Sequence, residues 1–176
     1  MSYKELVFEI NHKLGVPADY AQQRSLTIQK EASNLVEVET NAIGRIFRAS
    51  PDTAIAWLNM QTAAKVDDIV LQIGSAFRSI LYQAHLIEER LTSGRTIDDI
   101  LIGIAAPGYS EHHTGQAIDI ITEDSPPFTE HFELTPAFEW LELNAHQFGF
   151  HLSYPRHNPH GFIYEPWHWR YKTGDM

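Results

Sequence analysis

The sequence contains no cysteine among its 176 residues. Without thiols there is no disulfide framework, no thiolate metal site and no cysteine nucleophile, so any chemistry must use other side chains. Long apolar runs are also missing, since no stretch reaches the roughly 20 residues of a membrane-spanning helix. Residues 1–5 lack the basic start and apolar run of a signal peptide. We therefore expect either a cytosolic protein or a chain trimmed of a leader.

Positive charge is scarce as well. The 13 lysine and arginine residues are outnumbered by 23 aspartate and glutamate residues, which gives a formal net charge of -10. This excess argues against a protein that follows nucleic-acid phosphates and against attraction to anionic membranes. The remaining composition, with 43% apolar and 20% charged residues, is ordinary for a globular protein. The length suits one domain with a sizeable core.

Local patterns predict helices first and a small sheet afterwards. Capping residues and helical spacing predict helices over residues 51–65, 79–91, 96–103 and 135–148. Alternating or β-branched runs predict strands over residues 35–38, 69–73, 117–121, 150–154 and 167–171. This order is typical of an α+β fold with a mainly antiparallel sheet. We expect residues 1–30 to form an N-terminal extension that packs on a single domain, residues 31–176.

Histidine is concentrated in the C-terminal half, where eight of the ten lie between His112 and His168. Residues 110–119 contribute His112 and Asp119, and residues 165–171 contribute Glu165 and His168. Two histidines and an aspartate would leave one position open on a zinc ion, which distinguishes a catalytic zinc site from a structural one. A neighbouring glutamate is the group that a hydrolase needs to take a proton from water.

Each pair also has an ordinary structural interpretation. Asp119 lies between Ile118 and Ile120, so its buried carboxylate needs a partner, which could be a metal ion or a common salt bridge. Pro166 excludes a helix interior around Glu165 and His168, which could equally be a surface carboxylate and a histidine at the core edge. The residues alone leave both interpretations open.

Five further histidines are candidates for supporting or solvated positions: His113, His146, His151, His157 and His160. The His-Glu-x-x-His zinc-protease pattern and its inverted form are absent, as are a serine nucleophile elbow and a phosphate-binding loop.

Three ordered motifs carry a family resemblance. The pattern Ser-x-His-x-x-Gly-x-Ala-x-Asp is complete in residues 110–119, and Glu-x-x-His occurs within Tyr-Glu-Pro-Trp-His-Trp-Arg-Tyr at residues 164–171. Ser-x-aromatic-Arg-Ser occurs at residues 75–79 and is followed by Gln83. Over residues 65–171 the chain resembles the VanY-type zinc D,D- and L,D-carboxypeptidases. These belong to a wider set with the VanX dipeptidases, lysostaphin-like endopeptidases and the hedgehog signalling domain. The one small departure is His113, where Gln is common.

The resemblance implies a fold with helices packed on a small antiparallel sheet that carries the zinc site. It implies one zinc ion per chain, bound by His112, Asp119 and His168. Glu165 would be the general base that deprotonates the zinc-bound water and then protonates the leaving amine. Arg78 would stabilise the oxyanion of the tetrahedral intermediate.

The resemblance also suggests substrate contacts and an activity. Ser75 and Ser110 would orient the substrate, and Tyr154 and Trp167 would wall the cleft, although plain core packing explains the two aromatic residues nearly as well. The implied reaction removes a terminal D-alanine from peptidoglycan stem peptides or their precursors, with D,D or L,D stereochemistry. The alternatives are an endopeptidase that cuts inside the stem and a catalytically dead zinc-containing binding module. Glu165 and Arg78, which a dead module need not keep, favour the enzyme.

Overall fold

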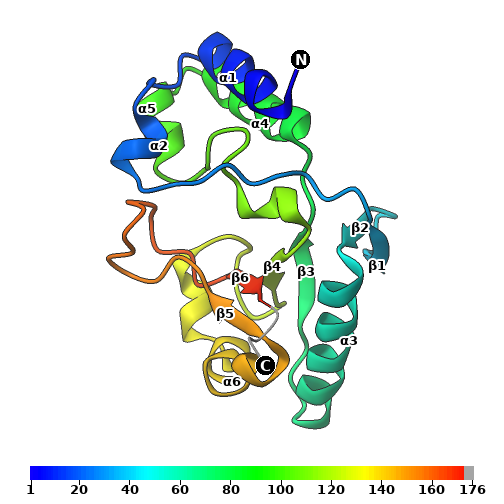
Figure 1. Ribbon diagram of the computed structural model, residues 1–176. Coiled ribbons are helices and arrows are strands. Elements are labelled where there is room, and N and C mark those ends of the chain that lie inside the picture. The colour runs from blue at the N-terminus through cyan, green and yellow to red at the C-terminus, as the bar shows by residue number, and fades with distance from the viewer. Residues whose placement is uncertain (173–176) are drawn as a thin grey trace.

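A computed structural model describes residues 1–172 of the chain (Figure 1). The helices are α1 (Tyr3–Leu14), α2 (Tyr20–Gln23), α3 (Pro51–Val66), α4 (Ile80–Thr92), α5 (Ile97–Leu101) and α6 (Pro136–Asn144). Short 3-10 helices are η1 (Glu111–Thr114), η2 (Glu130–Leu134) and η3 (Ala145–Phe148). The strands are β1 (Val36–Thr40), β2 (Ile46–Ala49), β3 (Gln72–Ser75), β4 (Ala117–Ile121), β5 (Phe150–Leu152) and β6 (His168–Tyr171).

The strands form two antiparallel sheets. Strands β1 and β2 make a two-stranded hairpin, and the other four strands are ordered β3-β4-β6-β5. Because neighbouring strands in the larger sheet come from distant parts of the chain, β4 and β6 bring residues about fifty positions apart into direct contact. The α+β class and the antiparallel sheet predicted from the sequence are confirmed.

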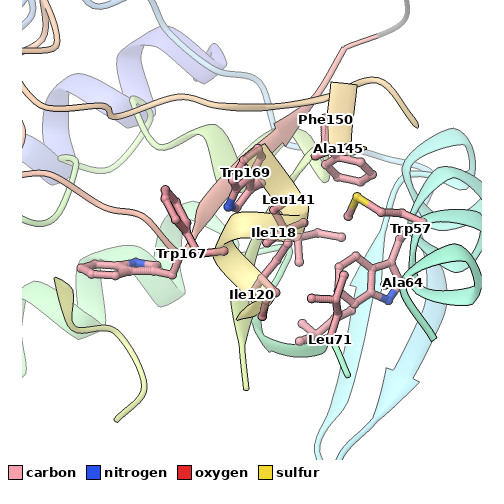
Figure 2. Packing of buried hydrophobic residues seen from close by; sticks show 14 of the residues in the cluster. Trp57, Ala64, Leu71, Ile118, Ile120, Leu141, Ala145, Phe150, Trp167 and Trp169 are labelled. Carbon is pink, nitrogen blue, oxygen red and sulfur yellow. The ribbon is translucent and has the colours of Figure 1, made fainter. Parts of the chain in front are cut away.

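One face of the larger sheet is covered by α3 and α6, and the main hydrophobic core lies there (Figure 2). Side chains alternate between the two faces along a strand, so Ile118 and Ile120 of β4 enter this core together with Trp169 of β6. Trp57 of α3 and Leu141 of α6 meet them from the helical side and are completely buried. The core therefore fixes which residues of β4 and β6 must point to the opposite face.

A second hydrophobic cluster joins α1, α2, α4 and α5 into a separate group of helices (Figure 1). Leu14 and Tyr20 from the first 30 residues pack there with Ile87 of α4 and Ile100 of α5. The N-terminal segment is thus part of this helical group. The division into an extension of residues 1–30 and a domain of residues 31–176 stays a prediction, and its last four residues, 173–176, lie outside the described part of the chain.

Several predicted elements need correction. No element was predicted for α1, α2 or β2, although a capping box between Ser2 and Glu5 and a left-handed Gly15 at the end of the helix mark α1 clearly. Strand β3 covers residues 72–75 instead of 69–73, because only that stretch finds a hydrogen-bonding partner in β4. The predicted helix 96–103 is shorter, and the predicted helix 135–148 ends in the separate 3-10 turn η3.

None of the helices within residues 1–172 combines the length and the apolar character needed to cross a membrane.

Candidate metal centre and active site

Strand register brings Asp119 and His168 together. They are direct partners in the β4–β6 ladder, and Asp119 also pairs with Ser75 of β3. Partners across antiparallel strands point to the same face, and here it is the face opposite the core residues Ile118 and Trp169. The antiparallel ladder alone therefore places a carboxylate and an imidazole side by side.

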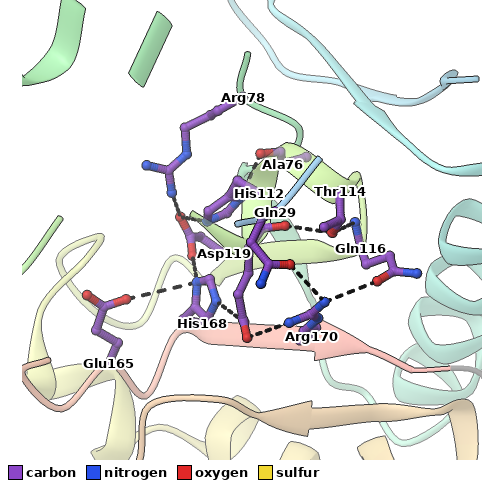
Figure 3. Close-up of polar contacts among 11 residues, drawn as sticks. Gln29, Ala76, Arg78, His112, Thr114, Gln116, Asp119, Glu165, His168 and Arg170 are labelled. Atoms are coloured by element: carbon purple, nitrogen blue, oxygen red, sulfur yellow. Dashed lines mark hydrogen bonds and ion pairs between the residues drawn. The ribbon is translucent and has the colours of Figure 1, made fainter. Parts of the chain in front are cut away.

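His112 reaches the same point from η1. Gly115 ends this turn with a φ of +69°, and an added Cβ would lie 2.9 Å from the backbone nitrogen of Ser50, so only glycine fits. The Nδ1 of His112 lies 2.7 Å from the carbonyl oxygen of Ala76. Because a carbonyl can only accept, Nδ1 carries the proton and Nε2 presents a lone pair. That lone pair faces Asp119 Oδ2 at 3.2 Å (Figure 3).

His168 is held from both sides of its ring. Its Nδ1 lies 2.9 Å from Asp119 Oδ1, and its Nε2 lies 3.0 Å from Glu111 Oε2. Glu111 is itself fixed by Arg170, whose guanidinium donates to Oε1 at 2.8 Å. Burial lowers the pKa of His168, but the hydrogen bonds that its ring donates to Asp119 and Glu111 outweigh burial and raise the pKa to about 10. Glu111 thus orients the ring so that Nδ1 points at Asp119.

This donor set fits a zinc ion. One ligand atom from each of His112, Asp119 and His168 lies within 4.8 Å of the others, and all three residues are buried. His112 Nε2 is buried and has no hydrogen-bond partner among residues 1–172, which is costly unless something electrophilic lies beside it. Burial and the charge of Arg78 lower the pKa of His112 to about 4, so its lone pair stays available at neutral pH. Nitrogen and carboxylate donors are the ligands that zinc takes.

Glu165 borders the three-residue cluster without belonging to it. Its Oε2 lies 3.9 Å from His168 Nδ1, and no other group within residues 1–172 forms a salt bridge or hydrogen bond with this carboxylate. The residue is only 8% exposed, and burial raises the pKa of its carboxyl group to about 7. A carboxylate with a pKa near neutrality and only one long ionic contact is suited to accept and return a proton.

Arg78 approaches Asp119 from the other side. Its guanidinium is 3.1 Å from Asp119 Oδ2 and donates to Gln83 Oε1 at 3.4 Å. Gln83 is nearly completely buried and is held in turn by the carbonyl oxygen of Ala105, 2.8 Å away. The backbone of Arg78 is fixed by His113, whose Nδ1 lies 2.6 Å from the Arg78 carbonyl oxygen. The guanidinium is therefore positioned by neighbours and not free to swing into solvent.

The cluster opens into two connected spaces. A small inner pocket of about 30 Å³ is bordered by Ser110 and Tyr154, and a larger outer cleft of about 490 Å³ is bordered by Ser75 and Trp167. Both spaces share Arg78 and Glu165, so these two side chains lie where the pockets meet. Tyr154 also stacks on the His168 ring with a centroid distance of 4.7 Å. All nine site residues predicted from the sequence thus gather in one region.

Some contributors were not predicted. Glu111, inside one recognised motif, and Gln83, just after another, received no role, and only the fold shows that they touch His168 and Arg78. Of the other candidate histidines, His113 is buried beside Arg78, whereas His146 and His157 are exposed. His151 and His160 are half-buried. None of the five joins the three-residue cluster.

Comparisons with known proteins agree with this geometry. The family model described as VanY, D-alanyl-D-alanine carboxypeptidase, matches residues 47–175. YodJ of Bacillus subtilis (strain 168), whose carboxypeptidase name is provisional, is 28% identical over 172 residues. That match covers 92% of this chain and 58% of YodJ, so the chain spans less than two thirds of this relative.

Two solved structures have the same fold. The LdcB LD-carboxypeptidase is 32% identical with a TM-score of 0.72, covering 81% of this chain and 70% of that one. The vancomycin-resistance D,D-pentapeptidase VanY, solved as a mutant with Zn(II), is 25% identical with a TM-score of 0.62. The match covers 85% of this chain and 88% of the VanY chain.

Proposed function

The chain belongs to the VanY family of D-alanyl-D-alanine carboxypeptidases, and on that premise we propose that it is a zinc-dependent carboxypeptidase acting on peptidoglycan stem peptides. It removes the C-terminal D-alanine. The observation that carries the proposal is the cluster of His112, Asp119 and His168 with the buried carboxylate of Glu165 beside it. The zinc-containing VanY structure supports the choice of metal.

We propose one zinc ion per chain, held by His112 Nε2, the Asp119 carboxylate and His168 Nδ1. When bound, zinc supplies a Lewis acid that polarises the scissile carbonyl and activates a water for attack. The remaining nitrogens of the two histidines donate to Ala76 and Glu111, an arrangement that fixes ring orientation and raises ligand basicity. Loss of the proton now shared between His168 Nδ1 and Asp119 accompanies metal binding.

Glu165 and Arg78 carry out the remaining tasks in hydrolysis, which are proton transfer and stabilisation of the oxyanion. Glu165 takes the proton from the attacking water and delivers it to the nitrogen of the departing D-alanine as the C–N bond breaks. Arg78 donates hydrogen bonds to the oxyanion that forms when the carbonyl becomes tetrahedral. Its place between the inner pocket and the outer cleft matches this role.

The two spaces differ greatly in size. The inner pocket of about 30 Å³ has room for about one water molecule and is also bordered by His112 and His168. The outer cleft of about 490 Å³ at Ser75 and Trp167 has room for the remaining stem. Ser110 is only 3% exposed, so its hydroxyl is a local hydrogen-bond donor for the terminal carboxylate. Recognition by such local donors is needed because the chain as a whole is acidic.

The test is mass analysis of a mixture of pentapeptide and tetrapeptide stems after incubation with the zinc-loaded protein. We expect loss of one alanine from the C-terminus, and the stem that shortens identifies D,D or L,D specificity. Stems with an amidated C-terminus have the same scissile bond and should react slowly. Equal rates on amidated stems, or cleavage between L-Ala and D-Glu, would indicate an endopeptidase. No cleavage by protein that contains stoichiometric zinc would indicate a binding module.

A further inference from the structure

The outer cleft carries positive charge where α4 and the turn before α5 border it. Arg90, near the end of α4, and Arg95, in the turn before α5, both border it. Within residues 1–172, no carboxylate oxygen lies within 4.0 Å of a nitrogen of either guanidinium. In a chain with a net charge of -10, two unpaired arginines on one wall of a cleft are unexpected.

Both guanidinium groups are nevertheless held in place. Arg90 donates to the carbonyl oxygen of Leu86 at 2.7 Å, and Arg95 donates to the carbonyl oxygen of Asp99 at 2.8 Å. A carbonyl oxygen fixes the side chain without neutralising its charge, and each guanidinium has five N–H donors. Further donors therefore remain for a group that enters the cleft.

The nearby acidic groups compensate these charges only in part, since the charge of Glu89 raises the pKa of Arg90 but does not outweigh burial and the charge of Arg95. The Asp99 carboxylate, which also borders the cleft, accepts instead from the Thr96 hydroxyl at 2.6 Å. Burial, and next the charge of Arg95, lower the pKa of Arg90, which means that the two like charges repel one another. An anion arriving between them would relieve that repulsion and gain charge-assisted hydrogen bonds.

Apolar side chains also border the outer cleft. Among them are Leu86, Ile104, Ile163 and Trp167. A ligand that reaches from Glu165 to Arg90 and Arg95 can therefore combine apolar contacts with a negative group. Because the proposed function places the remaining stem in the outer cleft, this negative group belongs to the part of the substrate on the N-terminal side of the scissile bond.

We propose that Arg90 and Arg95 form a carboxylate-binding subsite that selects stem peptides with a free carboxylate N-terminal to the scissile bond. The proposal rests on the proposed function for the direction of the substrate. Arginine is suited to the task because its planar guanidinium binds a carboxylate through two parallel hydrogen bonds. Arg90 and Arg95 are specificity-determining residues in this proposal, and they take no part in bond cleavage.

The experiment compares stem peptides that end in the same D-alanine bond. One peptide has free carboxylates on both the D-Glu residue and a diaminopimelate at the third position, and two others carry an amide at one of these carboxylates. We expect kcat/KM to fall about tenfold or more when the recognised carboxylate is amidated, as for hydrogen bonds to charged groups. The peptide that loses activity identifies which carboxylate is bound.

The variants Arg90→Gln and Arg95→Gln should remove that preference, because kcat/KM for the free acid falls toward the value for the amidated peptide. Arg95 is exposed, so its substitution tests the subsite even if the Arg90 variant folds poorly. The matched control is Arg48→Gln on β2, whose guanidinium pairs with Glu37 at 3.1 Å outside the cleft. This control should keep the preference.

Failure of the subsite and failure of the proposed function give different results. Equal kcat/KM for free and amidated peptides, or a preference that survives Arg95→Gln, overturns the subsite and leaves the carboxypeptidase intact. If no peptide is hydrolysed, the proposed function is overturned. The subsite is then tested by calorimetry, which measures the binding of stems that lack the terminal D-alanine, in free-acid and amidated form. If the free acid binds more tightly than the amide and this difference is lost in Arg95→Gln, the subsite is supported. Equal binding of the two peptides overturns the subsite.

Discussion

At the scale of single residues, we propose separable roles for three side chains around the cluster of His112, Asp119 and His168. Glu165 borders the ligands, Glu111 orients one of them and Arg78 faces the substrate carbonyl in our proposal. Substitutions at these positions should therefore change different measured quantities. Comparing metal affinity, kcat and KM separates proton transfer, ligand orientation and charge stabilisation.

For Glu165 we expect the substitution Glu165→Gln to leave zinc bound and to lower turnover roughly 100-fold or more, because glutamine has similar size but cannot accept a proton. Metal analysis and steady-state hydrolysis of a stem peptide provide the measurement. Turnover close to that of the unaltered protein would mean that another group activates the water, and the half-buried His151 would be examined next.

Glu111 is predicted to act through His168. Glu111→Gln can still hydrogen-bond Nε2, but it loses the negative charge that stabilises the donor N–H, so zinc affinity should fall about 10- to 100-fold. Competition with a zinc chelator measures the affinity. The control is Glu133→Gln, which removes a surface partner of Arg156 far from the cluster. Equal affinities for Glu111→Gln and the control would show that Glu111 does not support the ligand.

Arg78→Ala is expected to lower kcat more than it raises KM, since the proposed oxyanion contact exists only as charge develops on the carbonyl oxygen. Arg78→Lys should not restore activity, because an ammonium group lacks the planar fork held by Gln83 and Asp119. Zinc content must be measured in parallel, as Arg78 contacts a ligand. An effect confined to KM would instead assign Arg78 to binding a ground-state carboxylate.

At the scale of elements, the turn that joins η1 to β4 determines where His112 lies relative to Asp119. Gly115 makes this turn possible through its positive φ and through its close approach to the backbone of Ser50. The backbone nitrogen of Ser50 also donates to the Gly115 carbonyl oxygen at 2.9 Å, so the turn is joined to the start of α3. A side chain here would disturb both the turn and its contact.

Two glycines of positive φ allow a matched comparison. Gly94→Ala, where an added Cβ meets nothing within 4 Å, should lower the free energy of unfolding by about 1–2 kcal/mol, the cost of a left-handed conformation. Gly115→Ala should lower it by roughly a further 1–3 kcal/mol, because the backbone must also move. Denaturant unfolding of the metal-free proteins measures both. Equal costs would show that the contact with Ser50 relaxes freely.

At the scale of the whole molecule, the candidate metal centre joins η1, β4 and β6 on the sheet face opposite the main core. An ion that binds these three elements only in the folded protein must stabilise the fold by mass action. The same region borders the group formed by α1, α2, α4 and α5 through the cleft residues of α4 and α5.

We therefore expect zinc to raise the thermal unfolding midpoint and a chelator to lower it. With free zinc at a thousand times the dissociation constant, the stabilisation is about 4.1 kcal/mol. The shift should be absent in His168→Ala, which removes one proposed ligand. Differential scanning calorimetry with and without zinc measures it. An equal shift in His168→Ala would exclude His168 as a ligand.

The sequence by itself determined the chemistry that is available and the order in which it occurs. The motif at residues 110–119 and the pair Glu165 and His168 need only local spacing and residue type to be recognised, and the same holds for strand β4 and helix α3. Local signals also marked α1, through Ser2 and Gly15, but they were not used in the prediction.

Only the tertiary structure decided which of these groups meet. The register of β4 against β6 places Asp119 opposite His168, and no local pattern fixes the pairing of strands about fifty residues apart. The same reason explains why β3 was misplaced, since a strand ends where its partner ends. The roles of Glu111 and of Arg90 and Arg95 depend on contacts and unpaired charge that arise only when distant segments pack together.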